Sequence, residues 1–326
     1  MKAIRLEARP RKNQTPASDG LPVVACLEDA PVPEPGPGEV LLRLRATALG
    51  ATEQAVLSGL LPLGVAPGSE FTADVVQDRE GELVGARVAP LPSVPCGACG
   101  PCLAGNATLC PVRLIPGRSA RYGCLAEYFL FPRRGLFRLP HGLRDFDAIS
   151  LLPLASALNL PRKISLPGRV LVVSAGGLGL VVAASLRGLR QLLFLAMPNE
   201  DAIESVRKFS LHRDPGGRFP LVVAACDGPG VLARALDRVA PQGTLAVLGM
   251  PDSPSPVLPL VHRELTVIGI GEGEVTAAIK CMEEREVCEI LSRARPTIFP
   301  FAQADRALAH AADPSNLRVI VDNLDQ

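Results

Sequence analysis

Four cysteines stand within fifteen residues, in the stretch CGACGPCLAGNATLC between positions 96 and 110. The gaps between them are two, two and seven residues, and glycines lie among them. Such gaps let a tight turn aim successive sulfur atoms at one tetrahedral centre, and glycine allows the backbone to fold that closely. Four thiolates close the coordination sphere, which is typical of a structural zinc site. The predicted metal ligands are Cys96, Cys99, Cys102 and Cys110.

Two other interpretations of this cluster stay open. C-x2-C-x2-C with a Cys-Pro partner resembles an iron–sulfur run, although the last gap in such a run is three residues and here it is seven. Four unrelated thiols are the other alternative. Nine cysteines with four in one segment suit metal binding in a reducing cytosol better than a disulfide framework. We therefore expect a cytoplasmic protein with one structural zinc ion per chain.

Length and charge narrow the class of protein. A chain of 326 residues is too long for one ordinary core, so two domains are expected. The net charge is +1 and the basic residues are scattered, which argues against nucleic acid or an anionic membrane surface as the partner. The start MKAIRLEARP has no apolar signal segment. The longest uncharged run, between Arg169 and Arg187, is short for a membrane span and is broken by glycines.

The order of apolar runs changes along the chain. Up to about residue 145, Pro and Gly turn signals separate short strands, predicted at 23–30, 39–49, 71–76 and 84–91. Beyond that point strands alternate with helices, which predicts a parallel, doubly wound sheet. There the predicted strands are 169–174, 192–196, 221–225, 244–250 and 265–270, and the predicted helices include 148–164 and 231–240. The tail is predicted as strand 297–301, helix 304–312 and strand 317–324.

Several motifs, in order, resemble one known family. They are PVPEPGPGEVLLRL, the four-cysteine lobe, YGCLAEYF, RVLVVSAGGLG, and APQGTLAVLGM followed by RELTVIGI. Together they resemble the zinc-containing medium-chain dehydrogenase/reductase superfamily, of the alcohol dehydrogenase and threonine dehydrogenase type, over nearly the whole chain. The resemblance implies an α/β protein with a GroES-like β-rich domain and a Rossmann-type doubly wound parallel sheet.

The resemblance also implies domain bounds and assembly. Residues 1–145 would form the GroES-like substrate domain, with a zinc lobe at about 93–112, and 146–289 the Rossmann-like cofactor domain. Residues 290–326 would return to the first domain. The strand at 265–270 corresponds to the usual dimer edge, so a homodimer is implied, with a small molecule as substrate.

The family's catalytic zinc needs a cysteine, a histidine and a later cysteine or acid, and none is found here. By alignment of the motifs, Gly50, Ser69 and Leu152 stand at the three ligand positions. All four histidines lie outside residues 40–140. A lone carboxylate such as Glu70 is a poor zinc site without nitrogen or sulfur partners. The resemblance therefore implies that the structural zinc is retained and the catalytic zinc is lost.

Three polar residues remain as candidates for the chemistry: Thr52, Ser69 and Glu70. Thr52 stands where the family has the hydroxyl that relays a proton. Glu70, like Glu53, also has a plainer interpretation as a retained structural residue.

The motif that would bind the cofactor is altered as well. In G-x-G-x-x-G the first glycine makes the tight turn, the second admits the pyrophosphate and the third permits helix packing. Here Ser174 replaces the first glycine, and the strand at 192–196 ends without an acid or a base for the adenosine ribose. Only ten residues separate positions 210 and 221, which leaves little room for the family's extra strand and helix. The candidate cofactor-binding residues are Ser174, Gly176, Gly177, Leu178 and Gly179.

Two functions are compatible with these residues. The first is an oxidoreductase that transfers hydride between NAD(P)H and a small carbonyl or conjugated enone or alkene without a catalytic metal, because a positioned donor to the carbonyl oxygen can suffice. The alternative is a non-catalytic homologue that acts as a binding or assembly partner. A structural zinc contributes folding energy in either case.

Overall fold

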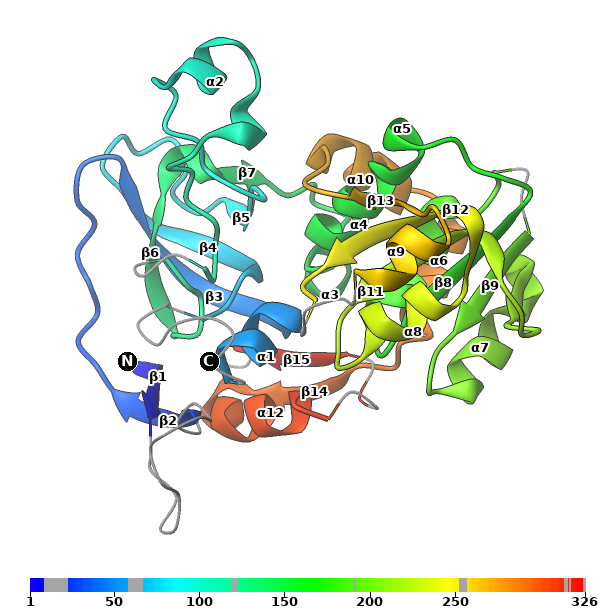
Figure 1. The fold of residues 1–326 in the computed structure, drawn as a ribbon. Helices are drawn as coiled ribbons and strands as arrows, with labels where there is room; N and C mark the ends of the chain where they lie inside the picture. The colour runs from blue at the N-terminus through cyan, green and yellow to red at the C-terminus, as the bar shows by residue number, and fades with distance from the viewer. Residues whose placement is uncertain are drawn as a thin grey trace. The chain divides into compact units, whose positions relative to one another are not determined.

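The computed structural model describes residues 1–8, 23–57, 67–118, 122–189, 192–251, 257–313, 316 and 318–324. The chain divides into two compact units. Figure 1 colours the chain by residue number, from blue at the N-terminus to red at the C-terminus. The first unit comprises residues 1–149, 297–312 and 319–326, and the second comprises residues 150–296 and 313–318. The chain thus enters the first unit, builds the second, and returns.

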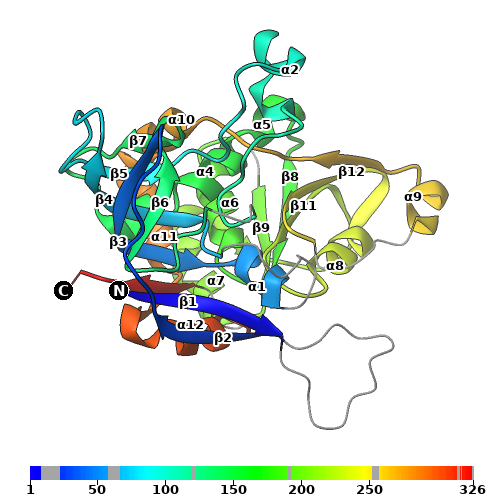
Figure 2. The same ribbon diagram turned by 90° about the vertical axis from the view of Figure 1, so that its left-hand side faces the viewer.

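The first unit is built on a seven-stranded sheet with the order β14-β15-β3-β4-β5-β7, and β6 also pairs with β3. Apart from the parallel pair β14–β15, its strands pair antiparallel. Strand β1 (Lys2–Ala8) forms a separate antiparallel pair with β2 (Val23–Asp29), seen side by side in Figure 2. The sheet strands are β3 (Glu39–Leu49), β4 (Glu70–Asp78), β5 (Arg87–Pro90), β6 (Tyr128–Pro132), β7 (Leu136–Arg138), β14 (Thr297–Pro300) and β15 (Val319–Asp322).

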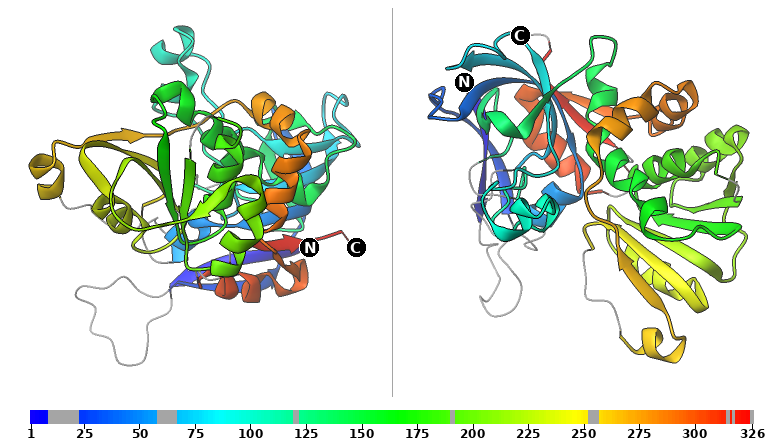
Figure 3. Two further views of the ribbon diagram at one scale, coloured as in Figure 1. Left: turned by 90° about the vertical axis from the view of Figure 1, so that its right-hand side faces the viewer. Right: turned by 90° about the horizontal axis from the view of Figure 1, so that it is seen from above.

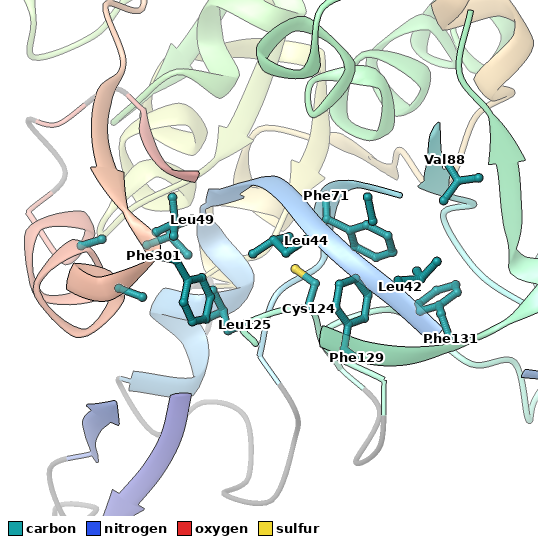
Figure 4. Packing of buried hydrophobic residues seen from close by; sticks show 14 of the residues in the cluster. Leu42, Leu44, Leu49, Phe71, Val88, Cys124, Leu125, Phe129, Phe131 and Phe301 are labelled. Carbon is teal, nitrogen blue, oxygen red and sulfur yellow. The ribbon is translucent and has the colours of Figure 1, made fainter. Parts of the chain in front are cut away.

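Short helices and an aromatic core complete this unit. Phe71 packs edge-to-face against Phe129 and Phe131, with ring centroids 4.9 and 5.3 Å apart, and Cys124 lies among these rings and the leucines of β3 (Figure 4). Edge-to-face pairs stabilise a core beyond the area they bury. The helices are α1 (Ala51–Leu57), α2 (Gly100–Leu103), η1 (Ala107–Leu109), η2 (Arg133–Gly135), α3 (Asp145–Ala148), η4 (Phe301–Gln303) and α12 (Ala304–Ala311).

The second unit contains a six-stranded parallel sheet with the order β10-β9-β8-β11-β12-β13. Counted from its first strand, this is the order 3-2-1-4-5-6 of a dinucleotide-binding sheet. The carboxyl ends of β8 and β11 are neighbours at the point where the strand order reverses, and ligands of such sheets bind at that point. The strands are β8 (Arg169–Ser174), β9 (Leu192–Ala196), β10 (Leu211–Arg213), β11 (Phe219–Cys226), β12 (Val239–Gly249) and β13 (Thr266–Gly269).

Helices cover this sheet. Helix α6 (Leu178–Leu186) is buried from its second residue onward, because it packs on the sheet and also against α4 (Leu151–Leu158) and α11 (Arg285–Ser292). Figure 3 shows these green and orange helices beside the strands. A helix covered on both sides is expected to be apolar all round, as α6 is. The others are α5 (Leu160–Lys163), α7 (Glu200–Val206), η3 (Arg207–Phe209), α8 (Val231–Asp237), α9 (Leu258–His262) and α10 (Val275–Met282).

The predicted fold class is confirmed, with one local difference. Each strand and helix predicted above has a counterpart in the structure within a few residues. The difference is β10, a three-residue strand in the interval judged too short for a strand and a helix. A strand of three residues fits within this interval, and residues 214–218 then lead directly into β11 without a helix. In the part of the chain that is described, no helix is both long and apolar enough to cross a membrane.

Candidate functional site

The four predicted metal ligands come together in a lobe around α2. Their sulfur atoms all lie within 4.8 Å of one another, so the group could hold a metal ion. Sγ of Cys102 is 3.4 Å from Sγ of Cys99 and 3.9 Å from Sγ of Cys96. Gly97 and Gly105 have φ angles of 79° and 77°, a backbone conformation that glycine adopts without steric cost. The spacing noted in the sequence therefore corresponds to a real convergence of sulfur atoms.

Backbone amides stabilise the thiolate form of one member of this cluster, Cys96. The N–H groups of Ala98 and Cys99 donate to Sγ of Cys96 at 3.4 and 3.3 Å. These bonds lower the pKa of Cys96 to about 6, which favours the thiolate, the form that binds metals. Four sulfur donors and no oxygen or nitrogen donor fit a tetrahedral structural zinc. Among the described residues, no other group of three or more His, Cys, Asp or Glu side chains is placed to hold a metal.

A second constellation lies at the start of α1. Glu53 is 2% exposed, and its Oε2 accepts a hydrogen bond from the backbone N–H of Gly50 at 2.8 Å. Its Oε1 accepts from the N–H of Gly68 at 3.1 Å and faces the hydroxyl of Ser69 at 3.5 Å. Burial raises the pKa of Glu53 above its ordinary value. One buried carboxyl group therefore bridges Gly50 and Ser69, the two first-unit positions where the resemblance places zinc ligands.

The loop that carries Ser69 is held against the core. Gly68 has φ +98°, and a Cβ atom there would lie 2.5 Å from Sγ of Cys124. That thiol donates to Oγ1 of Thr47 at 3.2 Å, and Thr47 in turn donates to the carbonyl oxygen of Glu70 at 2.8 Å. Burial raises the pKa of Cys124, so it remains a neutral thiol. These contacts hold the backbone of residues 68–70 against the core of the first unit.

The remaining predicted positions are placed as follows. Thr52 is a buried residue of α1, one position before Glu53. Glu70 is the first residue of β4 and is partly buried, as is Ser69. The structure brings Ser69 to Glu53, which the sequence did not pair. Leu152, the third ligand position by alignment, lies in α4 of the second unit.

The glycine turn joins β8 to α6 as predicted. The end of β8, the turn and the first residues of α6 contain the five predicted cofactor-binding residues, Ser174, Gly176, Gly177, Leu178 and Gly179. A Cβ atom on Gly179 would lie 2.6 Å from Cβ of Ser174, so this position needs glycine for the helix to approach the strand. The Oγ atom of Ser174 accepts hydrogen bonds from the N–H groups of Gly176 at 3.2 Å and Gly179 at 3.1 Å.

The turn also holds a residue that the sequence did not suggest, Asp227. Its carboxylate accepts hydrogen bonds from the backbone N–H groups of Ala175 at 2.8 Å, Gly176 at 3.0 Å and Leu178 at 2.9 Å. The hydroxyl of Ser174 donates to the same carboxylate at 2.8 Å. Burial raises the pKa of Asp227. The available sequence signal was its place as the first charged residue after β11, the strand beside β8.

The carboxylate of Asp227 occupies the place that the anion of a bound ligand would take. Amides that converge on a carboxylate at a strand–turn–helix junction have the arrangement that also receives a phosphate. In this respect the turn fits the pyrophosphate of a nicotinamide dinucleotide. The end of β9 offers fewer polar groups to the adenosine ribose of such a cofactor. The side chain of Asn199 accepts a hydrogen bond from the N–H of Ala202 and caps α7, and Glu200 pairs with Arg213.

Comparisons with known proteins agree with this architecture. The profile of the alcohol dehydrogenase GroES-like domain matches residues 36–141. L-threonine 3-dehydrogenase of Legionella pneumophila is 27% identical over 274 residues, 75% of this chain and 80% of that protein. A short chain alcohol dehydrogenase from Escherichia coli, solved in complex with NADH, has a TM-score of 0.75 at 22% identity, with 99% of each chain covered. Galactitol-1-phosphate dehydrogenase from Escherichia coli has a TM-score of 0.76 at 20% identity, covering 99% of this chain and 100% of that one.

Proposed function

Because the chain belongs to the zinc-containing medium-chain dehydrogenase/reductase superfamily, we propose that it is an alcohol dehydrogenase-like oxidoreductase that works without a catalytic zinc ion. The substrate class is a small carbonyl compound or a conjugated enone or alkene. The observation that carries the proposal is the bridge made by Glu53, whose two carboxyl oxygens are hydrogen-bonded to the loops where metal ligands would stand. Neither Gly50 nor Ser69 offers a side chain that binds zinc well.

The chain's own groups supply the polar chemistry in this proposal. A bound nicotinamide would supply or accept the hydride, and the amides of Ala175, Gly176 and Leu178 would hold its pyrophosphate. The raised pKa of Glu53 favours a protonated carboxyl group. In the structure the Ser69 hydroxyl is the donor toward Oε1 of Glu53, at 3.5 Å. In the proposal that hydroxyl turns to donate to a substrate oxygen, and a protonated Glu53 donates to Oγ of Ser69 instead. In this role Ser69 polarises the substrate carbonyl, and Glu53 orients the hydroxyl of Ser69.

A combined cofactor, metal and turnover measurement tests the proposal. Calorimetric titration with NADH and NADPH should show binding, and the protein should turn over a member of a panel of aldehydes, ketones and enones. Metal analysis should give about one zinc per chain, for the four-cysteine lobe. About two zinc ions per chain would refute the metal-free mechanism, and a flat titration at millimolar cofactor would refute nicotinamide dependence.

A matched pair of variants tests the role of Ser69. Ser69→Ala removes the proposed donor and should lower kcat by roughly a hundredfold, the scale of one oxyanion donor, with cofactor affinity unchanged. Ser292→Ala, at an exposed position in the second unit, is the control and should leave kcat unchanged. Equal kcat for both variants would remove Ser69 from the mechanism.

The second candidate is a non-catalytic homologue that serves as a binding or assembly partner. The hydrogen bonds of Asp227 favour it, because the amides that a cofactor would need are satisfied within the chain. This candidate predicts no turnover with any member of the panel. Turnover of even one substrate at a rate that depends on cofactor would refute it.

We also propose that the chain forms a homodimer through β13. In the described part of the chain β13 is hydrogen-bonded to β12 alone and ends the sheet, and Val267 on it is 46% exposed. An exposed edge strand offers unpaired backbone groups to another strand. A second copy would continue the sheet through that edge.

A further inference from the structure

We propose that Asp227 competes with the cofactor's pyrophosphate for the glycine turn, and so sets the chain's affinity for dinucleotides. The inference rests on the proposed function, since it concerns the same cofactor site. It assigns a role to a residue outside the glycine motif itself. The carboxylate must leave the turn before a phosphate group can take its place.

The count of available donors carries the argument. The N–H groups of Ala175, Gly176 and Leu178 point to Asp227, and that of Gly179 points to Oγ of Ser174. The N–H of Leu180 donates to the carbonyl oxygen of Gly177. The first three amides of α6 are therefore engaged within the chain. Each backbone N–H has one hydrogen, so a phosphate gains these bonds only when the internal acceptors lose them.

The sheet explains why Asp227 reaches this place. Strands β8 and β11 are neighbours and pair Ser174 with Ala225. Two residues beyond Ala225, the chain passes the amino end of α6, where the amides lie. A carboxylate there meets the positive end of the helix, which stabilises it as it would stabilise a bound anion.

Ser174 strengthens the hold of Asp227 on the turn. Its hydroxyl donates to the carboxylate at 2.8 Å, and the same oxygen accepts from Gly176 and Gly179. Glycine at this position would lack that hydroxyl. The serine in place of the first glycine and the aspartate after β11 therefore act as one hydrogen-bonded pair. A phosphate group at these amides would also meet the negative charge of the Asp227 carboxylate, and like charges repel.

Variants of the pair test the inference on the full-length, zinc-quantified protein. Asp227→Ala removes the competitor, and Asp227→Asn removes its charge with little change of shape. Both should tighten NADH binding about tenfold or more over wild type, the value of one charge-assisted hydrogen bond. Ser174→Gly should tighten it less, and in the double variant with Asp227→Ala it should add little, because the two residues act together. NADH fluorescence and calorimetry give the dissociation constants.

The control is Asp237→Ala, which makes the same change of charge at an exposed position at the end of α8. It should leave the affinity at the wild-type value. Thermal unfolding of each variant checks the fold, and Asp227→Asn keeps the test decisive if Asp227→Ala does not fold.

The outcomes separate this inference from the proposed function. Tighter binding by the Asp227 variants supports the inference whether or not any substrate is turned over. Equal, tight binding by wild type and variants overturns the inference and leaves the oxidoreductase proposal in place. No binding by any of them overturns both. Tighter binding with no turnover by any form would keep the inference and refute the proposed function.

Discussion

The buried carboxyl group of Glu53 yields a prediction about stability. The residue is 2% exposed, and each of its two carboxyl oxygens accepts a backbone hydrogen bond, one from Gly50 and one from Gly68. In Glu53→Gln one oxygen becomes an NH2 group, which cannot accept. Whichever way the amide turns, either the buried N–H of Gly68 or the partly buried N–H of Gly50 loses its partner, at a cost of about 1–3 kcal/mol in the free energy of unfolding.

The size of this loss should depend on pH. Burial raises the pKa of Glu53 above the ordinary 4.5, so the folded protein keeps a proton that the unfolded chain has lost. The contribution of Glu53 to the free energy of unfolding is therefore complete below pH 4.5. It falls as the pH rises through the window between 4.5 and the pKa of Glu53 in the folded protein. Glutamine does not titrate. The difference between wild type and Glu53→Gln should be largest at low pH and smaller above the window.

The chain offers a selective probe for the measurement. It has no tryptophan, and both tyrosines, Tyr122 and Tyr128, lie in the first unit with Glu53. Tyrosine fluorescence during urea unfolding therefore follows that unit, and linear extrapolation gives its stability at each pH. The control is Glu34→Gln at an exposed position in the same unit, which should match wild type. A Glu53→Gln protein as stable as wild type, or a difference that grows with pH, would refute the reasoning.

Three further predictions concern other parts of the chain. Cys110→Ser breaks the set of four sulfur donors and should reduce bound zinc from about one per chain toward none; unchanged zinc by metal analysis would show that the lobe does not need this ligand. Gly68→Ala forces Cβ against Cys124 at a positive φ and should cost the first unit roughly 3 kcal/mol in urea unfolding, whereas Gly38→Ala, with a positive φ but open space, should cost about 1–2. Val267→Lys at the β13 edge should shift a dimer to a monomer in sedimentation, and the equally charged surface control Val112→Lys should not; a monomeric wild type would contradict the dimer proposal.

Local patterns in the sequence predicted most of the fold. Strand β3 is one uninterrupted apolar-rich segment between a Pro-Gly turn and Gly50, and its predicted bounds, 39–49, agree with the structure. The four-cysteine lobe was predictable for the same reason, since all four ligands are close in the chain. Strand β10 was missed because three residues carry too little periodicity to mark a strand.

The candidate site was less predictable because its key contacts join distant segments. Glu53 meets Gly68 across fifteen positions, and Asp227 meets the turn from about fifty positions away. No local spacing marks such a pair. The order of parallel strands, which brings β11 beside β8, had to be known first. Ser174 was recognised as a departure from the glycine motif, but its role emerged only with its partner.

The return of the chain to the first unit bears on how the protein is made. Strand β15 pairs with β3 from Val319 opposite Leu49 to Asp322 opposite Ala46, so the sheet begun early in synthesis lacks that neighbour until residues 319–322 have left the ribosome. The second unit, by contrast, has all six strands of its sheet once residue 269 has emerged. During translation the later unit can finish its sheet first, while the edge of β3 waits unpaired and open to wrong partners.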